Sequence, residues 1–152
     1  MIPTEAPELP PGVVLDTNAV LDWLVFASQN MLSLSAAIQS GQLRWLTSPR
    51  MREELNRTLA YPALTRWNPD SERTLTAFDR WAVMQEEPVR ATHGPMVCSD
   101  PDDQVFMDLA LATGARWLVT HDRALLKLKR PAQLRGVWVV QPALWSLQIT
   151  GS

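Results

Sequence analysis

Short apolar runs alternate along this chain with segments whose apolar residues recur at helical spacing. Four runs have the length and composition of buried strands, at residues 13–15, 43–47, 117–120 and 137–140. Helical spacing occupies five other segments, at residues 18–40, 49–60, 69–87, 100–113 and 123–128. Parallel strands need such crossovers, because the chain must return to the same edge of the sheet before the next strand begins. The pattern therefore predicts a three-layer α/β fold, with helices on both faces of a parallel sheet of about four to five strands.

Several of these segments carry local boundary signals. Ser48 and Pro49 suit the N-cap and first position of a helix, and the Asp100–Pro101 pair repeats that arrangement. Gly114 is placed to end the helix that follows. Two further features are expected from the pattern, a break in the first helical segment at residues 28–30 and a short strand at residues 96–97.

The length and composition predict one globular domain between two less ordered ends. A chain of 152 residues suits a single domain, and 46% hydrophobic with 20% charged residues is ordinary for one. Residues 1–12 contain four prolines and no periodic apolar pattern. We therefore expect an extended or disordered arm at residues 1–12, a domain at residues 13–147 and a tail at residues 148–152.

Cysteine content and hydropathy predict the compartment. Cys98 is the single cysteine, which excludes an intramolecular disulfide and suits a reducing compartment. No apolar run approaches the ~20 residues of a membrane span. The N-terminus lacks the charged-then-apolar pattern of a signal peptide. We expect a cytoplasmic protein that does not cross a membrane.

Acidic side chains follow two of the predicted strands. Asp16 ends the first apolar run, Asp122 lies just beyond the third, and Asp100, Asp102 and Asp103 begin the helical segment between them. Ligands of open parallel sheets bind at the carboxyl ends of the strands, so these acids point to a site there. Oxygen ligands without a matching Cys or His cluster favour Mg²⁺ or Mn²⁺ over zinc. The alternative is that each aspartate only caps the next helix.

Helical phase separates some neighbouring acids and leaves others open. Glu54 lies on the flank of the apolar stripe of residues 49–60, whereas Glu53 points away from it. Asp108 falls opposite the apolar side of its helix and is expected to be exposed. Phase does not separate Asp102 from Asp103, because both project near the inward side.

Four motifs in one order resemble the PIN domain family. They are VVLDTN, SPRMREEL, CSDPDDQVFMDLAL and ARWLVTHDRALL. The resemblance extends over about residues 13–147 and is nearest to the branch of toxin components of toxin–antitoxin pairs, similar to VapC-type toxins. It implies that Asp16, Glu54, Asp103 and Asp122 form an acidic quartet. Supporting polar positions of the family match Asn18, Asp100 and Thr120. His121 departs from the glycine or arginine that is usual at its position and puts an imidazole beside the site.

The resemblance implies a metal-dependent ribonuclease that hydrolyses phosphodiester bonds of RNA with Mg²⁺ or Mn²⁺. Asp16 and Asp103 would then be direct or near-direct ligands, with Glu54 and Asp122 holding a water or a second ion. Its expected partners are an RNA substrate, a cognate antitoxin protein and a second copy in a homodimer. The net charge of −2 gives no independent sign of nucleic-acid binding.

Basic and aromatic residues have two interpretations each. Three arginines near the ends of the relevant segments are either phosphate guides or ordinary surface residues: Arg50, Arg52 and Arg123. The 7 tryptophans favour packing in the core or a subunit interface over base stacking. Trp67, in the segment TRWNP, is the best candidate for an exposed or interface position.

Two other functions remain open. The first is a phosphohydrolase of the haloacid-dehalogenase kind, but that family needs a second aspartate where this chain has Asn18, and a lysine before the late acids. No lysine precedes Lys127. The second is a non-catalytic PIN-like module that binds RNA or a protein partner. Retention of all four acids favours catalysis over this second alternative.

Overall fold

A sheet of five parallel strands forms the centre of the computed structural model, which describes residues 9–147. The strand order is β3-β2-β1-β4-β5, and each neighbouring pair is parallel. The strands are β1 (Gly12–Leu15), β2 (Arg44–Thr47), β3 (Ala82–Met84), β4 (Trp117–Val119) and β5 (Trp138–Val140). The predicted α/β fold with a parallel sheet is confirmed. The first eight residues of the predicted arm and the predicted tail lie outside the described residues.

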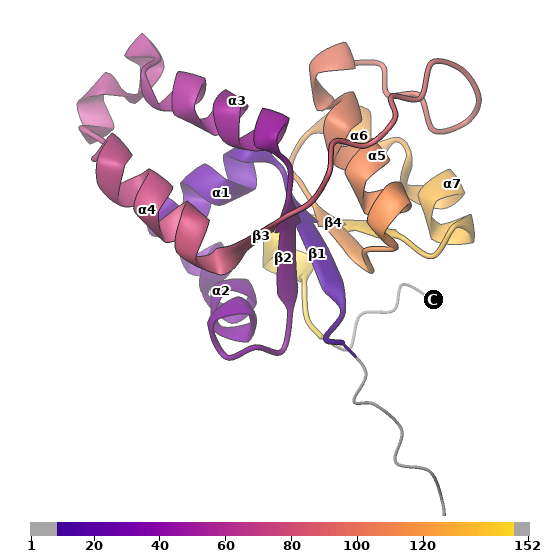
Figure 1. Ribbon diagram of the computed structural model, residues 1–152, viewed down its shortest axis with the longest axis horizontal. Helices are drawn as coiled ribbons and strands as arrows, with labels where there is room; N and C mark the ends of the chain where they lie inside the picture. The colour runs from indigo at the N-terminus through magenta and orange to yellow at the C-terminus, as the bar shows by residue number, and fades with distance from the viewer. Residues whose placement is uncertain (1–8, 148–152) are drawn as a thin grey trace, which may run out of the picture.

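Helices cover both faces of the sheet. On one face lie α1 (Thr17–Leu24), α2 (Leu32–Gln39), α3 (Pro49–Leu59) and α4 (Ser71–Trp81), and on the other α5 (Gln104–Thr113), α6 (Arg123–Leu126) and α7 (Lys129–Leu134) (Figure 1). Four short 3₁₀ segments connect them, η1 (Gln29–Met31), η2 (Pro62–Trp67), η3 (Pro101–Asp103) and η4 (Pro142–Leu144). Within residues 9–147, no helix is long and apolar enough to cross a membrane.

Alternation along β1 divides the apolar side chains between two cores. Val13 and Leu15 pack on the α1–α4 side, and Val14 packs on the α5–α7 side. All three are buried, because a strand in the middle of a three-layer fold has no face toward solvent. This is why the strand appears in the sequence as a continuous apolar run.

Tryptophans contribute to the first of these cores. The Trp45 ring lies 4.9 Å from that of Phe78 and 5.3 Å from that of Trp23, and Trp117 lies 5.5 Å from Trp145. Core packing is therefore the role of these rings. Trp67 is 47% exposed, as expected.

The prediction of a single helix over residues 69–87 was wrong. In the structure α4 ends at Trp81, and β3 begins at the next residue and pairs with β2. A three-residue strand that directly continues a helix has no sequence period of its own. Its pairing with β2 is a tertiary interaction that overrides the local pattern. Helix α7 was also missed, because Pro131 interrupts the helical signal of its short sequence.

The expected strand at residues 96–97 is also absent, and Asp108 is buried rather than exposed. Both errors have one cause, the irregular segment before η3, which packs along α5. Gln104 Nε2 donates to Met96 O at 3.0 Å, and Cys98 N donates to Gln104 Oε1 at 2.6 Å. Asp108 accepts from Ala91 N at 3.3 Å. These side chains satisfy the backbone of the segment in place of a neighbouring strand.

Replacing Gln104 by alanine is expected to destabilise the protein by about 1–3 kcal/mol, because Cys98 N and Met96 O would remain buried without partners. Gln39, exposed on α2, provides a control whose replacement by alanine should change stability by less than about 0.5 kcal/mol. Urea denaturation of the two variants measures both values. Equal midpoints would contradict this account of the segment.

Candidate functional site

Polar side chains meet at the carboxyl ends of β1 and β4. Asp16 follows β1 directly, and Thr120 and Asp122 follow β4. Because these strands are parallel neighbours, their carboxyl ends lie at the same edge of the sheet. Asp100 and Asp103 reach this edge from the other direction, since η3 leads into the N-terminus of α5.

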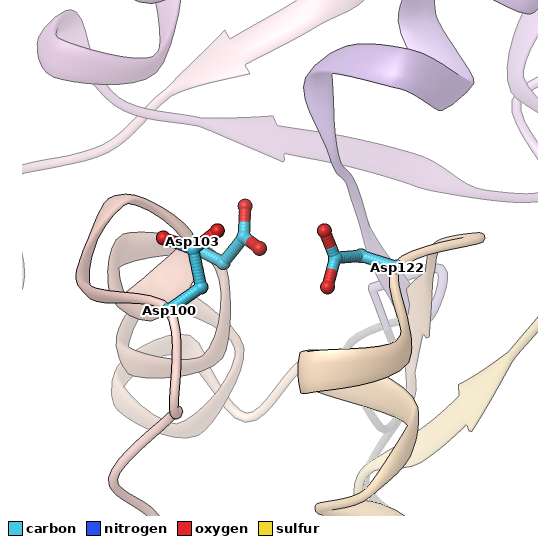
Figure 2. Close-up of side chains that lie close together, drawn as sticks. All are labelled: Asp100, Asp103 and Asp122. Atoms are coloured by element: carbon cyan, nitrogen blue, oxygen red, sulfur yellow. The ribbon is translucent and has the colours of Figure 1, made fainter.

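Three carboxylates at this edge form one group. Oxygens of Asp100, Asp103 and Asp122 all lie within 4.8 Å of one another. Figure 2 shows the carboxylates of Asp103 and Asp122 facing each other from two separate segments, with Asp100 beside Asp103. Asp103 Oδ2 is buried and has no hydrogen-bond partner. Burial, followed by the neighbouring Asp122, raises the pKa of Asp103 well above its ordinary value. This group has more negative charge than the protein alone compensates.

Asp16 lies deeper in the same edge and is held in place on both oxygens. Its Oδ1 accepts from Ala19 N at 2.8 Å, which makes it the N-cap of α1, and its Oδ2 accepts from the Thr120 hydroxyl. Thr120 Oγ1 also accepts from Asp122 N at 2.9 Å. Burial raises the pKa of Asp16 to about 6, although these hydrogen bonds oppose the increase. Thr120 thereby fixes the two strand-end acids relative to each other.

Glu54 joins the site from α3. It lines a hollow of about 360 Å³ together with Asp16, Asn18 and Asp103, and we call this the acidic hollow. Burial raises the pKa of Glu54, while a hydrogen bond from Thr17 lowers it. Glu53 is exposed, so the helical phase correctly separated the two glutamates.

The structure answers two questions that the sequence left open. Asp103 is half-buried within the three-carboxylate group, whereas Asp102 is exposed. Asp16 and Asp122 do cap helices, with Asp122 Oδ1 accepting from Ala124 N at 2.7 Å, and they also face the site. Among the described residues, the three-carboxylate group does not include Asp16 or Glu54. It does include Asp100, for which the sequence predicted only a supporting role.

Two nearby side-chain contacts involve residues whose partners the sequence did not predict. His121 Nε2 lies 3.1 Å from Asp22 Oδ2, so α1 and the end of β4 are linked at the rim of the site. Arg52, considered above as a phosphate guide, binds Asp79 on α4 through contacts of 2.7 and 2.8 Å. This contact joins α3 to α4, and the Arg52 guanidinium is therefore already bound by a protein carboxylate rather than free for a phosphate.

The donor set fits a hard divalent cation. Three carboxylates in one group are oxygen ligands of the kind that Mg²⁺ and Mn²⁺ prefer. The unpartnered Asp103 Oδ2 is a buried acceptor that needs a positive or hydrogen-bonding partner. A cation at this position would satisfy that oxygen and reduce the repulsion that raises the Asp103 pKa.

Comparisons with known proteins identify the family. The model of the PIN domain family matches residues 12–124, so this chain belongs to the PIN domain family. Among solved structures, the PIN domain endonuclease Utp24 matches with a TM-score of 0.48 and 16% sequence identity, over 81% of this chain and 80% of that one. A likeness this distant carries no argument about activity. No curated protein matches the chain.

Proposed function

We propose that this chain is a metal-dependent ribonuclease whose reaction takes place where the acidic hollow meets the three-carboxylate group, at Asp103. The observation that carries the proposal is the three-carboxylate group of Asp100, Asp103 and Asp122, with its unpartnered buried oxygen, in a domain of the PIN family. Members of this family are typically nucleases, and its nucleases generally use divalent metals. An acidic hollow attracts phosphodiesters only when a cation compensates its negative charge, so binding of an RNA substrate here requires a bound metal.

The four predicted acids have distinct roles in this proposal. Asp103 and Asp122 would hold Mg²⁺ or Mn²⁺, with Asp100 beside them. Asp16, which lines the acidic hollow together with Asp103, would complete the set from the end of β1. When bound, the cation supplies charge neutralisation for the scissile phosphate and lowers the pKa of a water. Glu54 also lines the acidic hollow, where it would accept a hydrogen bond from the attacking water and receive its proton.

Supporting residues keep these acids in place. Thr120 connects the Asp16 carboxylate to the Asp122 backbone, so neither acid turns away when the other changes its charge. Asn18, exposed on α1 at the mouth of the acidic hollow, offers an amide to the phosphate.

The biological setting is the second part of the proposal. The motifs resemble toxins of toxin–antitoxin pairs, so we infer a cytoplasmic toxin with a cognate antitoxin protein and a homodimeric assembly. A short reading frame for a DNA-binding protein beside that of this chain would support the toxin role. The homodimer stays a prediction.

The expected result of a direct assay is cleavage of single-stranded RNA in Mg²⁺ or Mn²⁺ and no cleavage in EDTA. Glu54→Gln should lower the rate by about a hundredfold, the typical contribution of a general base. The matched control is Glu53→Gln on the same helix, which should stay within about twofold, because Glu53 is exposed on the other side of α3. A gel assay with labelled RNA measures all three proteins.

Three outcomes of this assay have different meanings. RNA binding without cleavage would favour the non-catalytic module. Hydrolysis of small phosphate esters with RNA left intact would favour the phosphohydrolase. Equal loss in both glutamate variants would remove Glu54 from the mechanism.

A further inference from the structure

A second hollow adjoins the acidic hollow along α3. It has a volume of about 220 Å³ and is lined by Arg50, Glu54, Arg57, Tyr61, Asp102 and Val105. We call it the arginine groove. Glu54 and Tyr61 also line the acidic hollow, so the two hollows share a boundary. The two hollows therefore lie side by side at these two residues.

Helical spacing explains why two arginines flank the glutamate. Arg50, Glu54 and Arg57 are separated by four and three residues, so they form a stripe on one face of α3. Both guanidiniums lie close enough to Glu54 to lower its pKa, against the larger effect of its burial, which raises it. The stripe therefore places a positive charge on each side of an acid of the proposed active site.

Neither of these two guanidiniums makes a hydrogen bond or a salt bridge within residues 9–147, although both act electrostatically on Glu54. The side-chain contacts of this kind found there are Arg52 with Asp79 and His121 with Asp22. Some other arginines are engaged, since Arg90 Nη2 donates to Pro101 O and Arg80 stacks on Trp81. Arg50 and Arg57 thus keep their donors available to a ligand that enters the groove.

Tyr61 adds an aromatic surface where the two hollows meet. It follows the end of α3 and is 53% exposed, although an aromatic ring of this size is usually more deeply buried. An exposed ring between a pair of guanidiniums and a group of acids suits a nucleobase, because every base has a face that stacks on an aromatic ring.

We propose that the arginine groove is a binding subsite for the nucleotide next to the scissile phosphate of single-stranded RNA. Arg50 and Arg57 bind oxygens of its phosphodiester, and the Tyr61 ring stacks on its base. An acidic protein segment would also match the two arginines, but RNA is favoured because the groove lies beside the acidic hollow and shares Glu54 and Tyr61 with it. This inference rests on the ribonuclease function proposed above.

The test measures binding rather than cleavage. The probe is a fluorescein-labelled single-stranded 2′-O-methyl oligonucleotide with phosphorothioate linkages, titrated by fluorescence anisotropy in Mg²⁺ at several salt concentrations. The R50Q/R57Q variant should bind at least about tenfold more weakly. The slope of log affinity against log salt should become shallower by about 1.4, because each phosphate contact on a single strand contributes about 0.7. The control R130Q/R135Q removes two exposed charges, one in α7 and one directly after it, and should stay within about twofold of wild type.

Tyr61 is tested separately from charge. Tyr61→Ala should weaken binding about tenfold without changing the salt slope, and Tyr61→Phe should restore it, because the ring and not the hydroxyl stacks. Loss in Tyr61→Ala that Tyr61→Phe does not restore would overturn the stacking role.

Several results would overturn the subsite. If R50Q/R57Q binds like wild type while wild type cleaves RNA, the subsite fails and the ribonuclease stands. Equal weakening in R50Q/R57Q and R130Q/R135Q would show a response to bulk charge and would also reject it. Wild type that binds no oligonucleotide in Mg²⁺ would reject the subsite together with the proposed function. If the double variant does not fold, the single variants Arg50→Gln and Arg57→Gln test the subsite instead. Each is expected to show about half of the change in salt slope that is expected for the double variant.

Discussion

Replacing Asp103 by asparagine is expected to lower Mg²⁺-dependent RNA cleavage by about a thousandfold or more, while Asp102→Asn keeps most of the activity. Asp103 has the unpartnered buried oxygen of the three-carboxylate group. Asp102, one residue earlier in the same 3₁₀ segment, is exposed and lines the arginine groove rather than the acidic hollow. A thousandfold corresponds to about 4 kcal/mol, within the several kcal/mol that a bound cation contributes to transition-state stabilisation. An acid in the first turn of a helix contributes only about 0.3–1 kcal/mol, and it does so to stability.

A second measurement on the same variants separates loss of metal from loss of folding. In EDTA at neutral pH, Asp103→Asn should melt above wild type, because burial and Asp122 make the Asp103 charge unfavourable there. Asp102→Asn should melt at or slightly below wild type. Full activity of Asp103→Asn would reject its assignment as a ligand. An Asp103→Asn variant that is inactive and also less stable in EDTA would mean that the residue is structural.

The strand-end acids could be predicted because each lies within two residues of the apolar run whose end positions it. Asp16 directly follows an apolar run, and Asp122 lies two residues beyond another, so the strand and the candidate ligand are recognised together. Parallel pairing of β1 and β4 then brings them to one edge without further information. The caps at Ser48, Asp100 and Gly114 were found for a similar reason, since each depends on a local hydrogen bond or a local backbone angle.

The features that the sequence did not predict depend on contacts between distant segments. Strand β3 exists because Ala82–Met84 pairs with β2, although those residues continue a helical pattern. Asp108 is buried because the segment that contains Ala91 crosses its helix. The arginine groove joins α3 to the start of α5, segments about fifty residues apart. A signal for it was present, since Arg50, Glu54 and Arg57 have helical spacing, but the role of Tyr61 required the structure.

The stability of the metal-free protein is expected to fall as pH rises from about 4.5 to about 7.5. Burial raises the pKa of Asp16 to about 6, and it also raises the pKa values of Asp103 and Glu54. In this window the folded state binds more protons than the unfolded chain, in which these groups titrate at their ordinary values near 4. The free energy of unfolding therefore decreases as pH rises. Each group with a raised pKa contributes stability that is present at low pH and is lost as pH rises through the pKa of that group in the folded state.

The size of this decline follows from the most buried of these groups. Asp16 is 3% exposed, and its share of the loss over the window is about 2 kcal/mol, at 1.36 kcal/mol for each pKa unit. Asp79, whose pKa is lowered by its hydrogen bond with Arg52, is ionised throughout the window and does not reverse the trend. Urea denaturation in EDTA at the two pH values measures the loss, and Asp16→Asn should show a shallower decline.

Adding Mg²⁺ should restore most of the lost stability at the higher pH and change little at the lower one. A cation binds the ionised carboxylates of the folded state, and at a hundred times its dissociation constant it stabilises that state by about 2.7 kcal/mol. At about pH 4.5 the buried acids retain their protons, so the cation finds fewer charges to bind. A decline that Mg²⁺ leaves unchanged would show that the raised pKa values reflect burial alone. Stability that rises with pH in EDTA would mean that the acids of this edge are compensated by the protein itself, and the edge would then have no need of a cation.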